Sequence, residues 1–140
     1  MSEPASAVLA RATTTSAVLP RCSARVRPTA LSPRLARNLI RACFDNTAVS
    51  AQLVDRASRV AGELVEISRR AAWTELTIIA ESEADMLTVR VVEAGPRPRS
   101  VTGMAAAPGW DIVRRLATAY GYFSDASGNG VWAGFRRPGR

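Results

Sequence analysis

The stretch GELVEISRRAA, from Gly62 to Ala72, closes the longest helical pattern in the sequence. Its apolar residues continue a series that recurs at steps of three and four residues, which is the spacing of one face of an α-helix. The series comprises Leu53, Ala57, Val60, Leu64, Ile67 and Ala71. We therefore predict one amphipathic helix from about Ser50 to Ala72, with its apolar stripe packed on a core. Two oppositely charged pairs at a spacing of four are expected beside the stripe: Arg59 with Glu63, and Glu66 with Arg70.

The residues before this helix predict a strand and another helix. Cys22–Arg27 has the character of a short edge strand, closed by Pro28. Ser32 is a suitable helix cap and Pro33 suits a first turn, because its fixed φ angle is already helical. Apolar residues at helical spacing then extend this helix to about Phe44. The first half of the chain thus predicts strand, helix and helix.

The second half contains two patterns that alternate between apolar and polar residues, as half-buried strands do. A long loop with glycine, proline and arginine separates this strand pair from a third helix and a final hairpin. The expected elements are strands Leu76–Glu81 and Leu87–Val92, loop Ala94–Gly109, helix Trp110–Tyr120, and hairpin strands Gly121–Asp125 and Val131–Phe135.

Grouped helices and adjacent strand pairs predict the α+β class. We expect a two-layer sandwich, with three helices packed on one face of a mixed, mostly antiparallel sheet. A chain of 140 residues suits one core. The domain is expected over residues 21–137, after a flexible leader of residues 1–20 that is rich in alanine, serine and threonine.

Composition favours a globular protein without a membrane span. Hydrophobic residues make up 47% of the chain and charged residues 22%, which separates it from disordered sequences. Its apolar runs fall short of the roughly 20 residues that a bilayer requires. The N-terminal residues lack a basic segment followed by a solid apolar block, so we expect no secretory signal and a cytoplasmic location.

The net charge of +7 is unevenly placed. Residues 1–43 hold seven arginines against Glu3, whereas residues 44–140 hold twelve arginines against eleven acids. A basic arm of this kind could bind nucleic acid or an acidic protein patch. The alternative, which we favour, is a solvated tail with charged helix faces, so nucleic acid is not the expected partner.

The absence of histidine excludes Ser-His-Asp and Cys-His catalysis and histidine metal sites. Cys22 and Cys43 have no metal-ligand spacing and suggest no disulfide framework, so we expect them to be small buried apolar residues. Trp110 and Trp132 are likewise expected to fill the core.

Four segments in order carry a resemblance to a known family: ELVEISRRA (Glu63–Ala71), EAGPR (Glu93–Arg97), APGWDIV (Ala107–Val113) and GNGVWA (Gly128–Ala133). The chain resembles the anti-sigma-factor serine/threonine kinases, which are small members of the histidine-kinase-like (GHKL, HATPase) ATPase superfamily common in actinobacteria. The corresponding family motifs are E-L-V-x-N-A-x-x-H, D-x-G-P-G, G-x-G-L-x-L-V and G-x-T-V-W-A. The likeness covers about residues 20–136.

The resemblance makes Glu63 the candidate general base, acting on a serine of a partner protein. In the family, an asparagine four residues later binds Mg²⁺ from the same helix face. Ile67 occupies that position here and offers no oxygen to a cation that requires several. We therefore expect no metal ligand and no Mg²⁺. Ile67 also fits the apolar stripe, and Arg59 provides Glu63 with an ordinary ion-pair role as the alternative.

The second motif is altered at the positions that resemble nucleotide contacts. Glu93 replaces the aspartate that hydrogen-bonds adenine, and its extra methylene displaces the carboxylate. Gly95 is retained, while Arg97 replaces the next glycine. Arg97 and Arg99 could bind phosphates in place of the metal's charge. We favour the alternative that both are solvated side chains of the loop.

The third and fourth motifs are also partly changed. Gly109 is retained, but Ala107 replaces its partner glycine and Pro108 has no N–H to donate to a phosphate. Gly130 stands where the family usually has a threonine near the adenine. Glu93, Gly95, Arg97, Gly109 and Gly130 are therefore the cofactor-binding candidates of an altered ATP or ADP site.

The resemblance implies a regulatory protein, a pseudokinase that acts by protein–protein binding in a partner-switching stress-response circuit. Its expected partners are a sigma factor or an anti-sigma-factor antagonist, with a homodimer as a further candidate, and its ATP use is weak or absent. Two alternatives stay open. One is an active ATP-dependent serine/threonine kinase that phosphorylates the antagonist, and the other is a nucleic-acid-associated protein that uses the basic arm.

Overall fold

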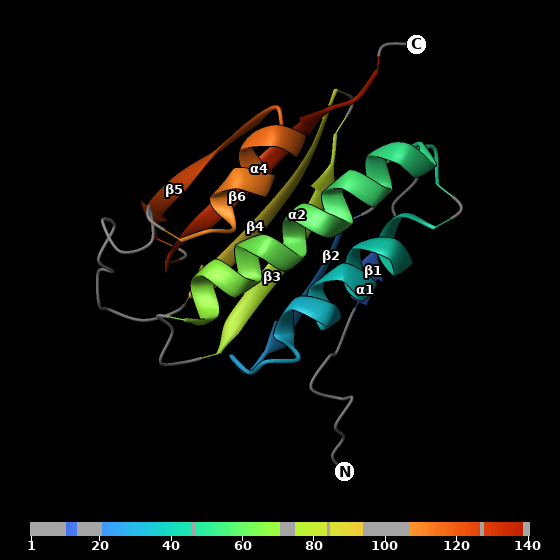
Figure 1. Cartoon of the computed structure of the whole chain (residues 1–140). Helices are drawn as coiled ribbons and strands as arrows, with labels where there is room; N and C mark the ends of the chain where they lie inside the picture. Colours follow the sequence, from blue (N-terminus) through green and yellow to red (C-terminus); the bar gives the residue numbers. More distant parts are fainter. Residues whose placement is uncertain are drawn as a thin grey trace.

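The computed structural model describes residues 11–13, 21–45, 47–70, 75–83, 85–93, 107–126 and 128–138. Within them, three helices lie on the same side of one sheet (Figure 1). The elements in chain order are β1 (Arg11–Thr13), β2 (Arg21–Val26), α1 (Ser32–Phe44), α2 (Ala51–Arg69), β3 (Leu76–Ser82), β4 (Met86–Glu93), α4 (Trp110–Leu116), β5 (Ala119–Asp125) and β6 (Gly128–Arg136). The α+β two-layer sandwich is confirmed.

The six strands are ordered β1-β2-β3-β4-β6-β5. Each neighbouring pair among these strands is antiparallel, so the sheet described here is antiparallel where we expected a mixed one. The register carries rows of residues across the sheet. One such row, Ala24–Ile78–Val91–Val131, is buried beneath the helices.

Helix α2 lies along the middle of the helical layer, with α1 and α4 on either side of it (Figure 1). The residues of its predicted stripe that the structure describes are buried: Leu53, Ala57, Val60, Leu64 and Ile67. Full burial of one such aliphatic side chain contributes about 1.5–3 kcal/mol to stability. The Ser50 side chain accepts a hydrogen bond from the Leu53 amide at 3.1 Å and caps the helix.

Three predictions for the N-terminal part of the chain needed correction. Strand β1 lies inside the segment 1–20 that we expected to be a leader, and its pairing places β2 inside the sheet, so β2 is not an edge strand. Ser32 is the first residue of α1, and it does not cap the helix. Its hydroxyl instead donates to the Arg27 carbonyl and accepts from the Thr29 amide, which fixes the turn between β2 and α1.

The third helix is shorter than predicted. It ends at Leu116, and Tyr120 belongs to β5, where it pairs with Ala133. The Thr118 amide donates to the Gly134 carbonyl of β6 at 2.8 Å, which draws the chain into the sheet. Hydrogen bonding to a strand that is distant in sequence here overrides the local helical pattern.

No helix in the described ranges is long and apolar enough to cross a bilayer.

Cys22 of β2 and Cys43 of α1 form a disulfide, with their Cα atoms 6.1 Å apart. Both residues are buried as predicted, but the expectation that they are unpaired was wrong. Their separation of 21 residues gives no local signal. Their proximity arises because α1 packs over β2, which only the tertiary structure reveals.

The disulfide should make stability depend on redox state. Because the bridge closes a loop of 21 residues in the unfolded chain, its loss should lower the free energy of unfolding by about 3 kcal/mol. Guanidinium unfolding of the oxidised protein, the reduced protein and the C22A/C43A variant would measure this. The variant is the control and should not respond to reductant. Equal midpoints for oxidised and reduced protein would contradict the prediction.

Candidate functional site

The structure brings Glu63 and Ile67 of α2 together with Gly109, the residue that precedes α4. A Cβ atom built on Gly109 would lie 2.8 Å from Glu63 Oε1 and 3.3 Å from Ile67 Cγ1. Ile67 is only 3% exposed and belongs to the core, as its place in the stripe predicted. Glycine at position 109 therefore allows the start of α4 to lie directly on α2.

Glu63 is a half-buried carboxyl group with unusual electrostatics. Burial raises its pKa above the ordinary value, and the nearby charge of Glu66 raises it further. Arg37 and Arg59 act in the opposite direction without cancelling the effect. No residue in the described part of the chain forms a hydrogen bond or ion pair with Glu63, so the predicted Arg59–Glu63 pair is not formed. A carboxyl group of this kind is suited to accepting a proton.

Glu66 forms the second predicted pair and a further one. Its oxygens accept hydrogen bonds from Arg70 at 2.9 Å and from Arg69 at 2.8 Å. Burial alone would raise the pKa of Glu66, but these two hydrogen bonds hold it below the ordinary value. Two neighbouring carboxyl groups on one helix thus have pKa values shifted in opposite directions.

Arg37 is a residue near this site that sequence reasoning missed. Its side chain crosses from α1 to α2, and a Cβ built on Gly62 would lie 2.8 Å from Arg37 Nη1. The Ser58 hydroxyl donates to the Arg37 carbonyl at 3.3 Å, which ties the two helices together at this level. The signal in the sequence was Gly62 within a helix, since glycine there costs stability unless another group needs the space.

Glu93 and Gly130 lie together on adjacent strands. In the β4–β6 register Glu93 is opposite Asn129 and Val92 is opposite Gly130. A Cβ on Gly130 would lie 1.9 Å from the Val91 carbonyl oxygen and 2.9 Å from the Phe123 ring. Gly130 is therefore required by close strand packing, whatever ligand binds nearby. Gly95 and Arg97, like Arg99, lie outside the described residues.

Trp110 and Trp132 lie on opposite faces of the sheet. Trp110 is buried as predicted, with ring centroids 5.6 Å from Tyr120 and 5.5 Å from Tyr122. Trp132 does not fill the core as we expected. It alternates with the buried residues Val131 and Ala133, so it lies half-buried on the face without helices, beside Gly121.

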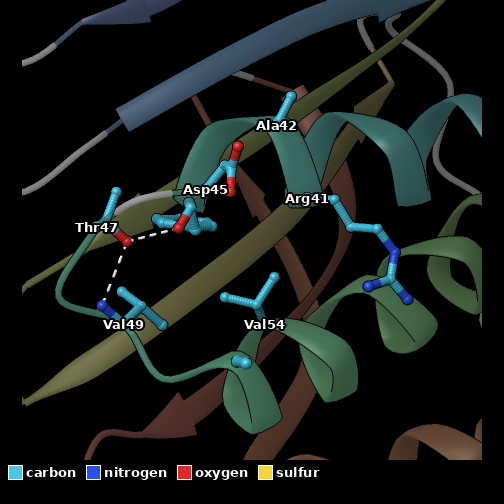
Figure 2. Close-up of a pocket in the computed structure, with 8 residues that line it drawn as sticks. Arg41, Ala42, Asp45, Thr47, Val49 and Val54 are labelled. Atoms are coloured by element: carbon cyan, nitrogen blue, oxygen red, sulfur yellow. Dashed lines mark hydrogen bonds between the residues drawn. The ribbon is translucent and has the colours of Figure 1, made fainter.

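A hollow in the described surface lies at the other end of α2, away from Glu63. Figure 2 shows it at the turn between α1 and α2, with Arg41 at its rim and Val49 and Val54 beside it. Its volume is about 530 Å³. Thr47 stabilises the turn, since its hydroxyl donates to the Phe44 carbonyl and accepts from the Val49 amide.

Within the described ranges, the acidic and cysteine residues form no cluster of three that could hold a metal ion. No protein-family model matches the chain, and no curated protein matches it. The resemblance to the anti-sigma-factor kinases therefore depends on the order of the four motifs.

Replacing Glu63 by glutamine should change how stability depends on pH. Because its pKa is raised in the folded protein, the wild type binds more protons folded than unfolded between pH 4.5 and the raised value. Its stability contribution is present below pH 4.5 and is lost as the pH rises through the folded pKa. The free energy of unfolding of E63Q, compared with that of wild type, should therefore be highest at neutral pH. Urea unfolding from pH 4 to 8 would measure the difference, and a constant difference would contradict the assignment.

Gly130 and Gly121 offer a matched pair of substitutions on the same sheet face. G130A would place a methyl group against the backbone of β4 and should destabilise the protein by roughly 3 kcal/mol. G121A should cost much less, because its Cβ would first meet the Trp132 side chain at 3.3 Å. Thermal unfolding of the two variants would compare them. Equal losses would show that the close approach at Gly130 does not set its identity.

Proposed function

We propose that this protein is a regulatory, kinase-like domain that works by binding other proteins and makes weak or no use of ATP. On the resemblance described above, its partners are a sigma factor or an anti-sigma-factor antagonist, in a partner-switching circuit. We place it in the cytoplasm, where the Cys22–Cys43 pair would be kept mostly as thiols. A homodimer is part of the same proposal.

The observation that carries the proposal is the contact of Gly109 with Glu63 and Ile67. In the family that this chain resembles, the glycines of the third motif approach the nucleotide phosphates, and the helix face carries the metal ligand. Here Gly109 packs so closely that even a Cβ would meet the Glu63 carboxylate. The metal-ligand position is an apolar residue within the core.

The chemistry of phosphoryl transfer supports the same conclusion. The transferred group carries charge that a metal ion or positioned cations must neutralise, so losing Mg²⁺ costs rate heavily. The described cations whose charges act on the Glu63 carboxyl group are Arg37 and Arg59. Protein binding, by contrast, requires a surface and no metal.

A second candidate function is favoured by one observation. The raised pKa of Glu63 is the property expected of a general base, so an active serine/threonine kinase with Glu63 as its base remains the alternative. This alternative requires α4 to move away from α2 when nucleotide enters. ATP or ADP would then be the ligand, with Glu93 and Gly130 at its adenine end.

Calorimetric titration of ATP and ADP into the full chain, with and without Mg²⁺, separates these functions. We expect no binding by the wild type at micromolar nucleotide. Micromolar, Mg²⁺-dependent binding would overturn the proposal and favour the kinase.

Two variants at Ile67 sharpen the result. I67N restores an oxygen ligand, and I67A is the matched control, because it opens space without adding an oxygen. Burial of the asparagine amide should cost about 1–3 kcal/mol, so thermal unfolding must first show that both variants are folded. Nucleotide binding by I67N alone would show a pocket that lacks chiefly its metal ligand. No binding by any of the three proteins would show that the pocket itself is closed.

A further inference from the structure

The outer surface of α1 and α2 carries five arginines. They are Arg34, Arg37 and Arg41 on α1, and Arg56 and Arg59 on α2. Spacings of three and four residues place the members of each set on one helix face. The two helices lie side by side in front of the sheet (Figure 1), so both sets belong to one surface. We call these five residues the arginine surface.

One of the five arginines of this surface forms an ion pair within the described part of the chain. Arg41 pairs with Asp55 across the two helices at 2.9 Å. The other four form no ion pair with any residue in the described part of the chain. Arg37 and Arg59 interact with the Glu63 carboxyl group electrostatically, without an ion-pair contact. Their charges lower the pKa of Glu63 by less than burial and Glu66 raise it.

Some arginines elsewhere in the domain form ion pairs. On β2, Arg21 binds Glu81 at 2.7 Å and Arg25 binds Glu75 at 3.1 Å. At the end of α2, Arg69 and Arg70 share Glu66. On the arginine surface, five arginines lie beside the two acids Asp55 and Glu63, so positive charge is in excess, and like charges in excess repel one another and lower the stability of the folded state. A surface that keeps this repulsion is suited to binding an anionic partner.

Two hollows with mixed polar and apolar linings lie beside the arginine surface. Val49, Val54 and Phe44 line the hollow of Figure 2, which has Arg41 at its rim. A second hollow of about 620 Å³, lined by Leu53, Pro138 and Arg56 among others, lies by the start of α2. Each is large enough to accept an apolar side chain. The surface thus combines guanidinium groups with depressions that are partly apolar, as protein interfaces commonly do.

We propose that the arginine surface binds an acidic segment of a protein partner, with carboxylates on the guanidinium groups and an apolar side chain in a hollow. Arginine suits this role, because its planar fork binds carboxylates with two parallel hydrogen bonds. The inference rests on the proposed function, since it gives the chemistry of the partner and the surface that receives it.

Nucleic acid fits this surface less well. Asp45 lines the hollow of Figure 2 and Asp55 pairs with Arg41, so the arginine surface is interrupted by carboxylates and forms no continuous track for a phosphate backbone. Single-stranded nucleic acid also needs exposed aromatic rings for base stacking. Phe44 is the sole aromatic residue of α1 and α2 and is only 2% exposed.

The test is an NMR titration of the full, isotope-labelled chain with a short helical peptide of glutamate and leucine. Its control is the same peptide with lysine in place of glutamate. The glutamate peptide should shift amide signals of α1 and α2, and the lysine peptide should not. Shifts confined to other elements, or none at millimolar peptide, would overturn the proposal. A DNA duplex that shifts the same signals at lower concentration would overturn it in favour of nucleic acid.

Two charge-reversal variants test the residues themselves. R34E/R56E alters the arginine surface, and R115E/R136E changes the net charge equally at exposed positions of α4 and β6. The first should weaken peptide binding about tenfold or more, and the second should change it little. Equal weakening would mean that net charge alone attracts the peptide. The nucleotide titration described above tests the proposed function independently of this result. If the protein bound both the glutamate peptide and Mg²⁺–ATP, the proposed function would be rejected, but the assignment of the arginine surface as a peptide-binding surface would be retained.

Discussion

The packing of α2 on the sheet is the interaction on which the other features depend. One face of this helix covers the buried residues of the central strands, its flanks receive α1 and α4, and its exposed face carries both Glu63 and part of the arginine surface. A helix held on three sides cannot shift to suit a ligand without disturbing the core. The close approach of Gly109 to α2 is therefore a property of the whole fold.

Much of this architecture could be predicted from periodicity. The stripe of α2, the alternation in β3 and β4, and the helix that begins at Ser32 are local patterns, and the structure confirms them. The errors share a physical origin. The early end of α4, the disulfide, the inward place of β2 and the outward place of Trp132 all depend on which elements become neighbours, and no local spacing encodes this.

The candidate site was predictable in part for the same reason. Glu63 and Ile67 share a helix, so their common face follows from a spacing of four. That Gly109 would lie against them, or that Arg37 would cross Gly62, could not be read from the chain, because each contact joins distant segments. The motif resemblance located Gly109 without predicting that it would be packed shut against the glutamate. Position 109 requires glycine because of this close packing, whether or not a phosphate binds there.

The strand order has a consequence for synthesis of the chain. β6 is the last strand that the structure describes, yet it lies between β4 and β5 inside the sheet. Val26 pairs with Leu76 only after both α1 and α2 have been made, and β4 meets β6 only after α4. While the ribosome works, the apolar stripe of α2 therefore has no complete sheet to cover. Part of its apolar surface therefore stays exposed until β6 has been made, and exposed apolar surface of this kind favours aggregation during folding.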